Sequence, residues 1–283
     1  MSTLVILGAG DLGGALARQL AAADVVSTIV LVDEAGAAAE GKALDIRQAS
    51  PVDRYSTSLR GSSQLDAAIG TDFVVLADRF SASDGEWHGD SAVALVSRVS
   101  ALNKRAPILC AGAKQADVVG RAVRELGLPR SQVFGSAAEG LRSAIIALTA
   151  LEASCAATDI ELSVIGRAPD HIIVPWEEAS IGGRRATEVL SPPSIARLEA
   201  RLTRLWPPGP LTLASAATRV IRAALSRTPR TVSAFVSVAR EQGALGAVGM
   251  LPVTVSPHGV EKVVVPALCR RDQVRLETAL TGN

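Results

Sequence analysis

Three glycines near the start of the chain have the spacing of a phosphate-binding turn. Gly8, Gly10 and Gly13 form a Gly-x-Gly-x-x-Gly pattern between an expected strand, Leu4–Leu7, and an expected helix, Leu12–Ala22. In such a unit the first glycine permits a tight turn, the second lets a diphosphate approach the backbone, and the third lets helix and strand pack closely. The helix N-terminus adds free N–H groups and a partial positive charge. We therefore expect a dinucleotide to bind here, through Gly8, Gly10, Asp11, Leu12 and Gly13.

An acidic residue follows at the distance that a dinucleotide site requires. Asp33 comes 20 residues after Gly13 and closes a second apolar run, Thr28–Val32. A carboxylate at this position accepts hydrogen bonds from the ribose hydroxyls and repels a 2′-phosphate. No basic residue follows within the next several positions, so the pattern favours NAD over NADP. Ala77, at the end of a later strand, is also expected beside the cofactor. The alternative is a glycine-rich turn in another kind of α/β protein.

The first half of the chain alternates short apolar runs with amphipathic segments. Further strands are expected at Phe73–Ala77, Ile108–Ala111 and Gln132–Gly135, and helices at Ala38–Ala49, Ala92–Asn103 and Ala116–Leu126. Alternation of this kind, with continuous β-branched runs, is typical of a parallel sheet covered on both faces. The fold class is therefore α/β, with a Rossmann-type doubly wound parallel sheet.

The second half has a different pattern, in which strands follow one another between helices. Strands are expected at Glu161–Ile165, paired with Ile172–Val174, and at Thr231–Val238, Ala247–Val255 and Val260–Val265. Helices are expected at Ser194–Leu205, Ala214–Leu225 and Asp272–Leu280. This order predicts an α+β unit with an antiparallel sheet. We place an NAD-binding domain at residues 1–140 and a substrate domain at residues 141–283.

Composition narrows the classes of partner. The chain has 283 residues and a formal net charge of +1, without the basic excess of a general nucleic-acid binder. Its three cysteines are dispersed, which favours a reducing compartment over a disulfide framework. The sequence shows no metal-ligand cluster, signal peptide or membrane-spanning run, so we expect a cytoplasmic protein without a bound metal. Cys110 is expected to pack in a buried strand as a small hydrophobe.

Several further segments resemble the malate/lactate dehydrogenase family, most closely the bacterial malate dehydrogenases of lactate-dehydrogenase type. These segments are Gly41–Asp45, Ala49–Val52, Gly127–Arg130, Val133–Gly135, Gly249–Val253 and His258–Lys262. The resemblance covers nearly the whole chain. It implies a Rossmann domain followed by an α+β domain, NAD as cofactor, hydride transfer between the nicotinamide and a 2-hydroxy acid, and a homodimer or homotetramer.

The positions that carry the family's chemistry hold other residues. The catalytic histidine of a Gly-x-His-Gly-Asp stretch corresponds to Ala168, and the Leu-Asp-x-Ala-Arg run corresponds to Gly140–Ile145, with neither aspartate nor arginine in place. The two arginines of the mobile loop are replaced within Ala77–His88, and the Asn-Pro-x-Asp turn reads Ala113–Ala116. We therefore expect no ordinary malate or lactate oxidation.

Two histidines could replace the missing proton acceptor. His171 lies three residues from the expected position, with Asp170 or Glu139 as a conceivable partner, and the alternative is an exposed turn histidine. His88 and Arg79 lie on the segment that corresponds to the mobile loop, which closes over substrates in many enzymes. Each could equally be a solvated loop residue.

Two arginines flank the expected active site. Arg142 and Arg167 come from different segments, and each could bind an anionic group of a substrate or be a surface arginine. The sequence therefore favours an NAD-dependent oxidoreductase acting on a non-standard hydroxy or keto substrate, with His171, Arg142, Arg167 and His88 as candidate catalytic residues. The alternative is a catalytically inactive NAD-binding sensor or scaffold.

Overall fold

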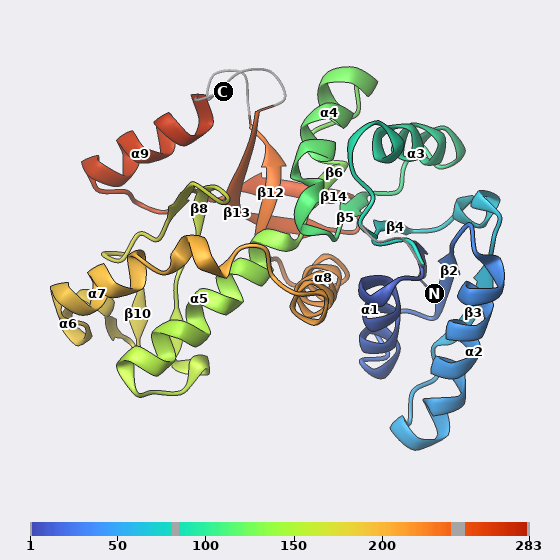
Figure 1. Ribbon diagram of the computed structural model, residues 1–283, viewed down its shortest axis with the longest axis horizontal. Helices are drawn as coiled ribbons and strands as arrows, with labels where there is room; N and C mark the ends of the chain where they lie inside the picture. The colour runs from blue at the N-terminus through green and yellow to red at the C-terminus, as the bar shows by residue number, and fades with distance from the viewer. Residues whose placement is uncertain (1, 81–84, 239–246, 282–283) are drawn as a thin grey trace.

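The computed structural model describes residues 2–80, 85–238 and 247–281, and one continuous sheet joins its two halves (Figure 1). The strand order is β3-β2-β1-β4-β5-β6-β12-β13-β8-β9, and β14 also pairs with β13. The first six strands are parallel: β3 (Ser58–Ser62), β2 (Thr28–Val32), β1 (Thr3–Leu7), β4 (Phe73–Leu76), β5 (Ile108–Cys110) and β6 (Val133–Gly135). This confirms the doubly wound parallel sheet.

Helices cover both faces of this sheet because successive strand residues point to opposite sides. Leu4 and Ile6 pack in one core cluster, whereas Val5 and Leu7 pack in the other. The first cluster is covered by α1 (Asp11–Ala22), α2 (Gly36–Asp53), α5 (Ala137–Ala153) and α8 (Pro210–Ala224), and the second by α3 (Gly89–Leu102) and α4 (Ala116–Leu126). The continuous apolar runs of the parallel strands follow from burial on both sides.

The second half extends the same sheet in antiparallel fashion. Its strands are β12 (Arg230–Ser237), β13 (Val248–Ser256), β14 (Gly259–Val263), β8 (Ile165–Arg167) and β9 (His171–Ile173). The antiparallel sheet is thus confirmed, and β12 joins it to β6 through Phe235 and Gly135. The division at residue 140 stays a prediction. The remaining helices are α6 (Ala186–Val189), α7 (Pro192–Glu199) and α9 (Arg270–Thr281).

Two details of the expected elements were wrong. The segment Glu161–Ile165 is not one strand: β7 (Ile160–Glu161) joins β10 (Ser180–Ile181) and β11 (Arg184–Arg185) in a separate sheet, and the partner of β9 is β8. Leu162 lies between β7 and β8, and its carbonyl accepts a hydrogen bond from the side chain of Arg142 instead of from the backbone of a neighbouring strand. The expected helix Ser194–Leu205 ends as α7 at Glu199, before a 3-10 turn at Leu202–Leu205. The edge strand β3 was not predicted, because Leu59 is its one fully buried apolar side chain.

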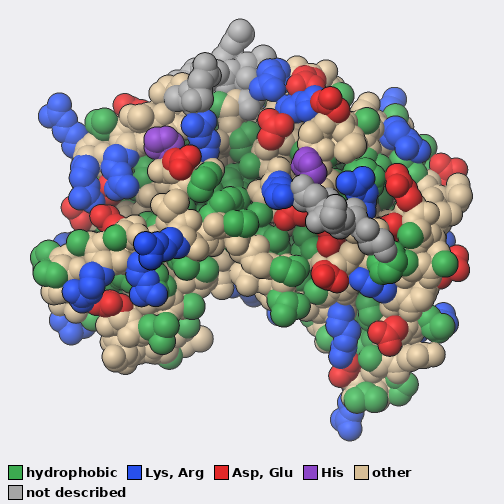
Figure 2. Space-filling view, viewed as in Figure 1, with side chains coloured by type: hydrophobic (Ala, Val, Ile, Leu, Met, Phe, Trp, Pro, Cys, Tyr) green, Lys and Arg blue, Asp and Glu red, His purple; other side chains and the backbone are tan. Residues whose placement is uncertain are grey.

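Charged side chains of both signs are interspersed over the face shown in Figure 2. Among the described residues, no helix is long and apolar enough to cross a membrane. Within the same part of the chain, no group of three or more histidine, cysteine, aspartate or glutamate side chains is placed to hold a metal ion.

Cys110 should resist alkylation in the folded protein. Its side chain is 0% exposed at the end of β5, and burial raises the pKa of the thiol to about 12. Because the thiolate is the reactive form, we expect iodoacetamide at pH 8 to modify the half-buried Cys155 and Cys269 long before Cys110. Peptide mass spectrometry would measure this, with a sample in urea as the control in which all three react. Rapid native labelling of Cys110 would show that β5 opens readily.

Candidate nucleotide site

The glycine-rich turn joins the carboxyl end of β1 to α1 and lies beside the carboxyl end of β2. The N–H of Gly8 donates to the carbonyl of Val32 (2.7 Å), and the N–H of Ala9 donates to Oδ2 of Asp33 (2.8 Å). A Cβ on Gly13 would lie 2.1 Å from the carbonyl oxygen of Gly8, so only glycine allows α1 to start this close to β1. The strand, turn and helix expected from the sequence are therefore in place.

The side chain of Asp78 lies on the N-terminus of α1. Its Oδ2 accepts a hydrogen bond from the N–H of Leu12 (3.0 Å), and its Oδ1 accepts one from the N–H of Gly13 (2.8 Å). The N–H of Gly10 donates to the backbone carbonyl of Asp78 (2.9 Å). These are the amide groups that the sequence pattern assigns to a diphosphate. Sequence reasoning missed this role of Asp78, although its place two residues after the end of β4 puts it at the same sheet edge as the turn.

Asp33 is almost fully enclosed, with 5% of its surface exposed. Its Oδ1 accepts a hydrogen bond from the N–H of Ala35 (2.9 Å), and its Oδ2 accepts from the N–H groups of Ala9 (2.8 Å) and Phe80 (2.9 Å). A carboxylate has about four acceptor positions, so three are taken by the protein. Asp33 therefore ties together the turn, the end of β2 and the segment after β4, and keeps little capacity for ribose hydroxyls.

A pocket of about 380 Å³ opens beside Asp33. It lies between the ends of β1 and β2 on one side and α3 on the other, and its lining includes Val32, Asp33, Ser63, Leu65, Trp87 and Arg98. An aromatic ring, aliphatic side chains and a few polar groups are typical of a small-ligand pocket. The pocket adjoins the turn at the position where the adenosine of a dinucleotide bound at this turn would lie.

The segment after β4 is held by several contacts around this pocket. Asp78 forms a β-bridge with Glu86, and the guanidinium of Arg79 lies over the ring of Trp87, 4.8 Å from its centroid. Lys42 lies over the ring of Phe80 at 5.6 Å, and its Nζ donates to the carbonyl of Gly10 (2.7 Å). Arg79 is thus placed on an aromatic side chain of the pocket wall. Residues 81–84 of the segment predicted to be a mobile loop lie outside the described residues.

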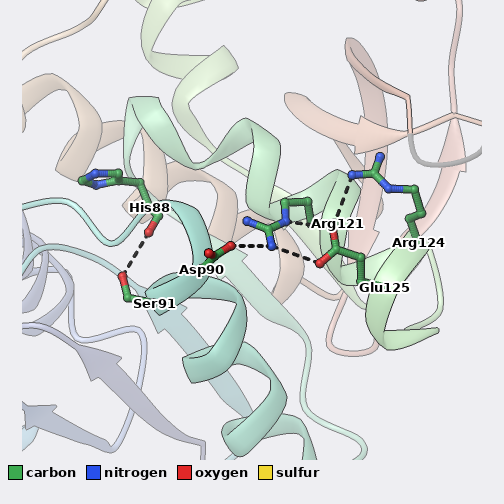
Figure 3. Close-up of polar contacts among 6 residues, drawn as sticks. All are labelled: His88, Asp90, Ser91, Arg121, Arg124 and Glu125. Atoms are coloured by element: carbon green, nitrogen blue, oxygen red, sulfur yellow. Dashed lines mark hydrogen bonds and ion pairs between the residues drawn. The ribbon is translucent and has the colours of Figure 1, made fainter.

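His88 lies at the start of α3 (Figure 3). Its Nδ1 donates to the carbonyl of Glu86 (2.8 Å), its own carbonyl accepts from Ser91 Oγ (3.0 Å), and its ring points away from the neighbouring ion pairs.

In those ion pairs, Arg121 of α4 joins Asp90 and Glu125 at 2.8 Å each. The hydrogen bond from Arg121 lowers the pKa of the Glu125 carboxyl below its usual range. The cluster ties α3 to α4.

Two of the other candidates face each other in the hairpin β8–β9. Arg167 and His171 are opposite each other in the antiparallel register, and both are half-buried. Gly166 has a φ of +103°, and a Cβ there would lie 2.1 Å from the carbonyl oxygen of His171, so the two strands approach closely at this point. The catalytic role of His171 stays a prediction.

Arg142 is engaged within the protein. Its Nε donates to the carbonyl of Leu162 (2.7 Å), and its Nη1 donates to Oε1 of Glu139 (3.0 Å). Glu139 is 2% exposed and also pairs with Arg219 (2.7 Å) and accepts from the N–H of Ser233 (2.7 Å). The guanidinium that was expected to bind a substrate anion therefore neutralises a buried carboxylate. Glu139, in turn, has these partners instead of the conceivable contact with His171.

The residues at the family's proton-transfer positions cannot exchange a proton. In the run Gly140–Ile145, Arg142 stands at the place of the aspartate and pairs with Glu139, and Ile145 stands at the place of the arginine and is 1% exposed in the core. Ala168, at the place of the histidine, is half-buried in the β8–β9 turn and packs against the same core. A methyl group offers no acceptor for a hydroxyl proton, and a guanidinium is a hydrogen-bond donor without an acceptor atom.

The comparisons with known proteins agree with this geometry. Residues 2–90 match the NAD-binding domain of lactate/malate dehydrogenases. The malate dehydrogenase of Thioalkalivibrio sulfidiphilus is 31% identical over 208 residues, which span 71% of this chain and 68% of that protein. The malate dehydrogenase of Desulforudis audaxviator is 26% identical over 296 residues, which span 98% of this chain and 94% of that protein.

Solved structures show the same fold over the whole chain. A malate dehydrogenase from Aeropyrum pernix has a TM-score of 0.86 at 16% identity and covers 98% of this chain and 95% of its own. A minor L-lactate dehydrogenase from Enterococcus mundtii, solved with bound ligands, has a TM-score of 0.84 at 16% identity with the same coverage of both chains.

Proposed function

This chain belongs to the malate/lactate dehydrogenase family, and from that premise we propose that it binds NAD but does not oxidise malate or lactate by the family's mechanism. One observation carries the proposal: the proton-transfer positions hold Ala168 and Arg142, and the guanidinium of Arg142 is engaged by Glu139 and the carbonyl of Leu162. Loss of a general base alone slows an enzyme by about 10²–10⁴-fold. The role that this arrangement supports best is a cofactor-binding sensor or scaffold.

Support for nucleotide binding comes from the first third of the chain. The pocket lined by Trp87 and Arg98, beside the glycine-rich turn, fits the adenosine half of NAD, and Asp33 keeps about one acceptor position for a ribose hydroxyl. The diphosphate does not fit in the observed conformation, because the N–H groups of Leu12 and Gly13 already donate to Asp78. Binding of the whole dinucleotide therefore requires the Asp78 side chain to leave these amides.

A second candidate function is hydride transfer on a different hydroxy or keto substrate. The register of β8 and β9 favours it, since it sets His171, three residues from the family's histidine position, opposite Arg167. In this reaction NAD supplies the hydride acceptor when bound. His171 would hold the hydroxyl proton, and Arg167 would bind an anionic group of the substrate.

A homodimer or homotetramer also stays a prediction. It is supported by large apolar side chains on exposed helix faces, among them Val52 on α2, which is 82% exposed, and Leu211 on α8, which is 70% exposed. The predicted cytoplasmic location is likewise a proposal that rests on the family.

We expect the purified protein to show kcat/KM values at least about a thousandfold below those of the Thioalkalivibrio enzyme with malate or lactate and NAD, and with oxaloacetate or pyruvate and NADH. Absorbance at 340 nm measures both directions. Turnover comparable to the relative would overturn the proposal. A panel of other 2-keto acids tests the second candidate: oxidation of NADH by one of them that is lost in His171→Gln would establish that candidate in its place.

A further inference from the structure

We propose that Asp78 is a specificity-determining residue, a built-in anion that competes with the diphosphate of NAD for the glycine-rich turn. This chain would then bind an uncharged adenosine-type ligand about as well as it binds a dinucleotide. The proposal rests on the proposed nucleotide binding, because it concerns the same site.

The contacts of Asp78 match those of a bound anion. Each carboxylate oxygen accepts one backbone N–H, from Leu12 (3.0 Å) and from Gly13 (2.8 Å), at the positive end of α1. A Cβ on Gly10 would lie 2.3 Å from Oδ2 of Asp78, so the carboxylate occupies the space that the second glycine leaves for an incoming phosphate. A diphosphate and this carboxylate cannot share the turn, for lack of both space and free donors.

The backbone on both sides of Asp78 is anchored. The N–H of Ala77 donates to the carbonyl of Leu7 (3.0 Å), the N–H of Gly10 donates to the carbonyl of Asp78 (2.9 Å), and the N–H of Phe80 donates to Asp33 (2.9 Å). Rotation of the side chain about its own bonds therefore releases the amides at lower cost than movement of the strand end. Even after such a rotation, the negative charge stays beside the diphosphate and opposes it.

Other features of the turn still favour a phosphate. Lys42 holds its Nζ 2.7 Å from the carbonyl oxygen of Gly10 and adds a positive charge beside the turn. Among the described residues, the side chain of Asp78 accepts hydrogen bonds from the N–H groups of Leu12 and Gly13 in the first turn of α1. Without this carboxylate, the positive end of the helix and Lys42 should attract an anion to the turn. The neighbouring pocket, with Trp87 and Arg98, is not lined by Asp78 and gives an independent measure of adenosine binding.

The test compares Asp78→Asn and Asp78→Ala with the wild-type protein by calorimetric titration with adenosine, ADP-ribose and NAD. Asp72→Asn is the matched control. Asp72 directly precedes β4, at the end of that strand away from the turn, and its carboxylate also accepts a hydrogen bond from a backbone N–H, that of Thr3 (2.8 Å). We expect both Asp78 variants to bind ADP-ribose and NAD at least about tenfold more tightly than the wild type and the control. Adenosine affinity should change less than about twofold across all four proteins.

The outcomes separate this inference from the proposed function. If the wild type binds NAD and neither Asp78 variant binds it more tightly, the inference fails and NAD binding stands. If none of the proteins binds adenosine, ADP-ribose or NAD, both fail. The wild-type protein alone gives a measurement that does not depend on the folding of a variant. If its affinity for ADP-ribose exceeds its affinity for adenosine by more than about tenfold, Asp78 does not compete with the diphosphate and the inference is wrong.

Discussion

Replacement of Gly13 by alanine is expected to lower the free energy of unfolding by about 2–3 kcal/mol and to abolish nucleotide binding. The added Cβ would lie 2.1 Å from the carbonyl oxygen of Gly8, and this oxygen belongs to backbone that cannot move without displacing β1. Relief of the clash must push α1 away from the strand. That movement also pulls the N–H groups of Leu12 and Gly13 from the anion position, whether Asp78 or a phosphate occupies it.

Gly41 provides the matched control for this prediction. It lies inside α2, and an added Cβ would meet nothing within 4 Å, so alanine there should raise the free energy of unfolding by about 0.5–1 kcal/mol through its higher helix propensity. Urea denaturation followed by circular dichroism measures both variants. A Gly13→Ala protein as stable as the wild type would mean that the turn has room for a side chain and that the third glycine has no packing role.

The nucleotide half of the molecule could be predicted well because its signals are local. The spacing of Gly8, Gly10 and Gly13 and the distance to Asp33 depend on one turn and two short strands, and the structure places all of them at one sheet edge. Asp78 was missed because it belongs to the third element that reaches this edge. Its contact with Leu12 spans 66 positions of sequence, and no local pattern distinguishes a loop carboxylate that binds these amides from a solvated one.

The second half was harder to predict because its pairings are not local. Periodicity found β12, β13 and β14, but it did not indicate that β12 would pair with β6 and continue the first sheet. The expected strand Glu161–Ile165 failed for a related reason, since a side chain from α5, Arg142, removes the carbonyl of Leu162 from the ladder. The functional expectation for Arg142 depended on the same unseen partners, which engage its guanidinium inside the protein.

Those partners lead to the other large effect expected, in the variant Glu139→Ala. The carboxylate of Glu139 is 2% exposed and joins three elements: Arg142 on its own helix, Arg219 on α8 and the N–H of Ser233 on β12. Its removal leaves a buried N–H and a half-buried guanidinium without their acceptor and opens a small cavity. We expect the free energy of unfolding to fall by about 3–4 kcal/mol, because a buried charge that loses its partner is strongly destabilising.

Glu125→Ala is the control, because Glu125 is also a helical glutamate paired with an arginine, Arg121, but lies exposed on α4. Solvent screens that pair, so its loss should change stability only slightly. Glu139→Gln should fall between wild type and Glu139→Ala, since the amide keeps one acceptor oxygen but cannot neutralise two guanidinium groups. Equal denaturation midpoints for Glu139→Ala and Glu125→Ala would mean that the Glu139 network does not hold α5 and α8 to the sheet.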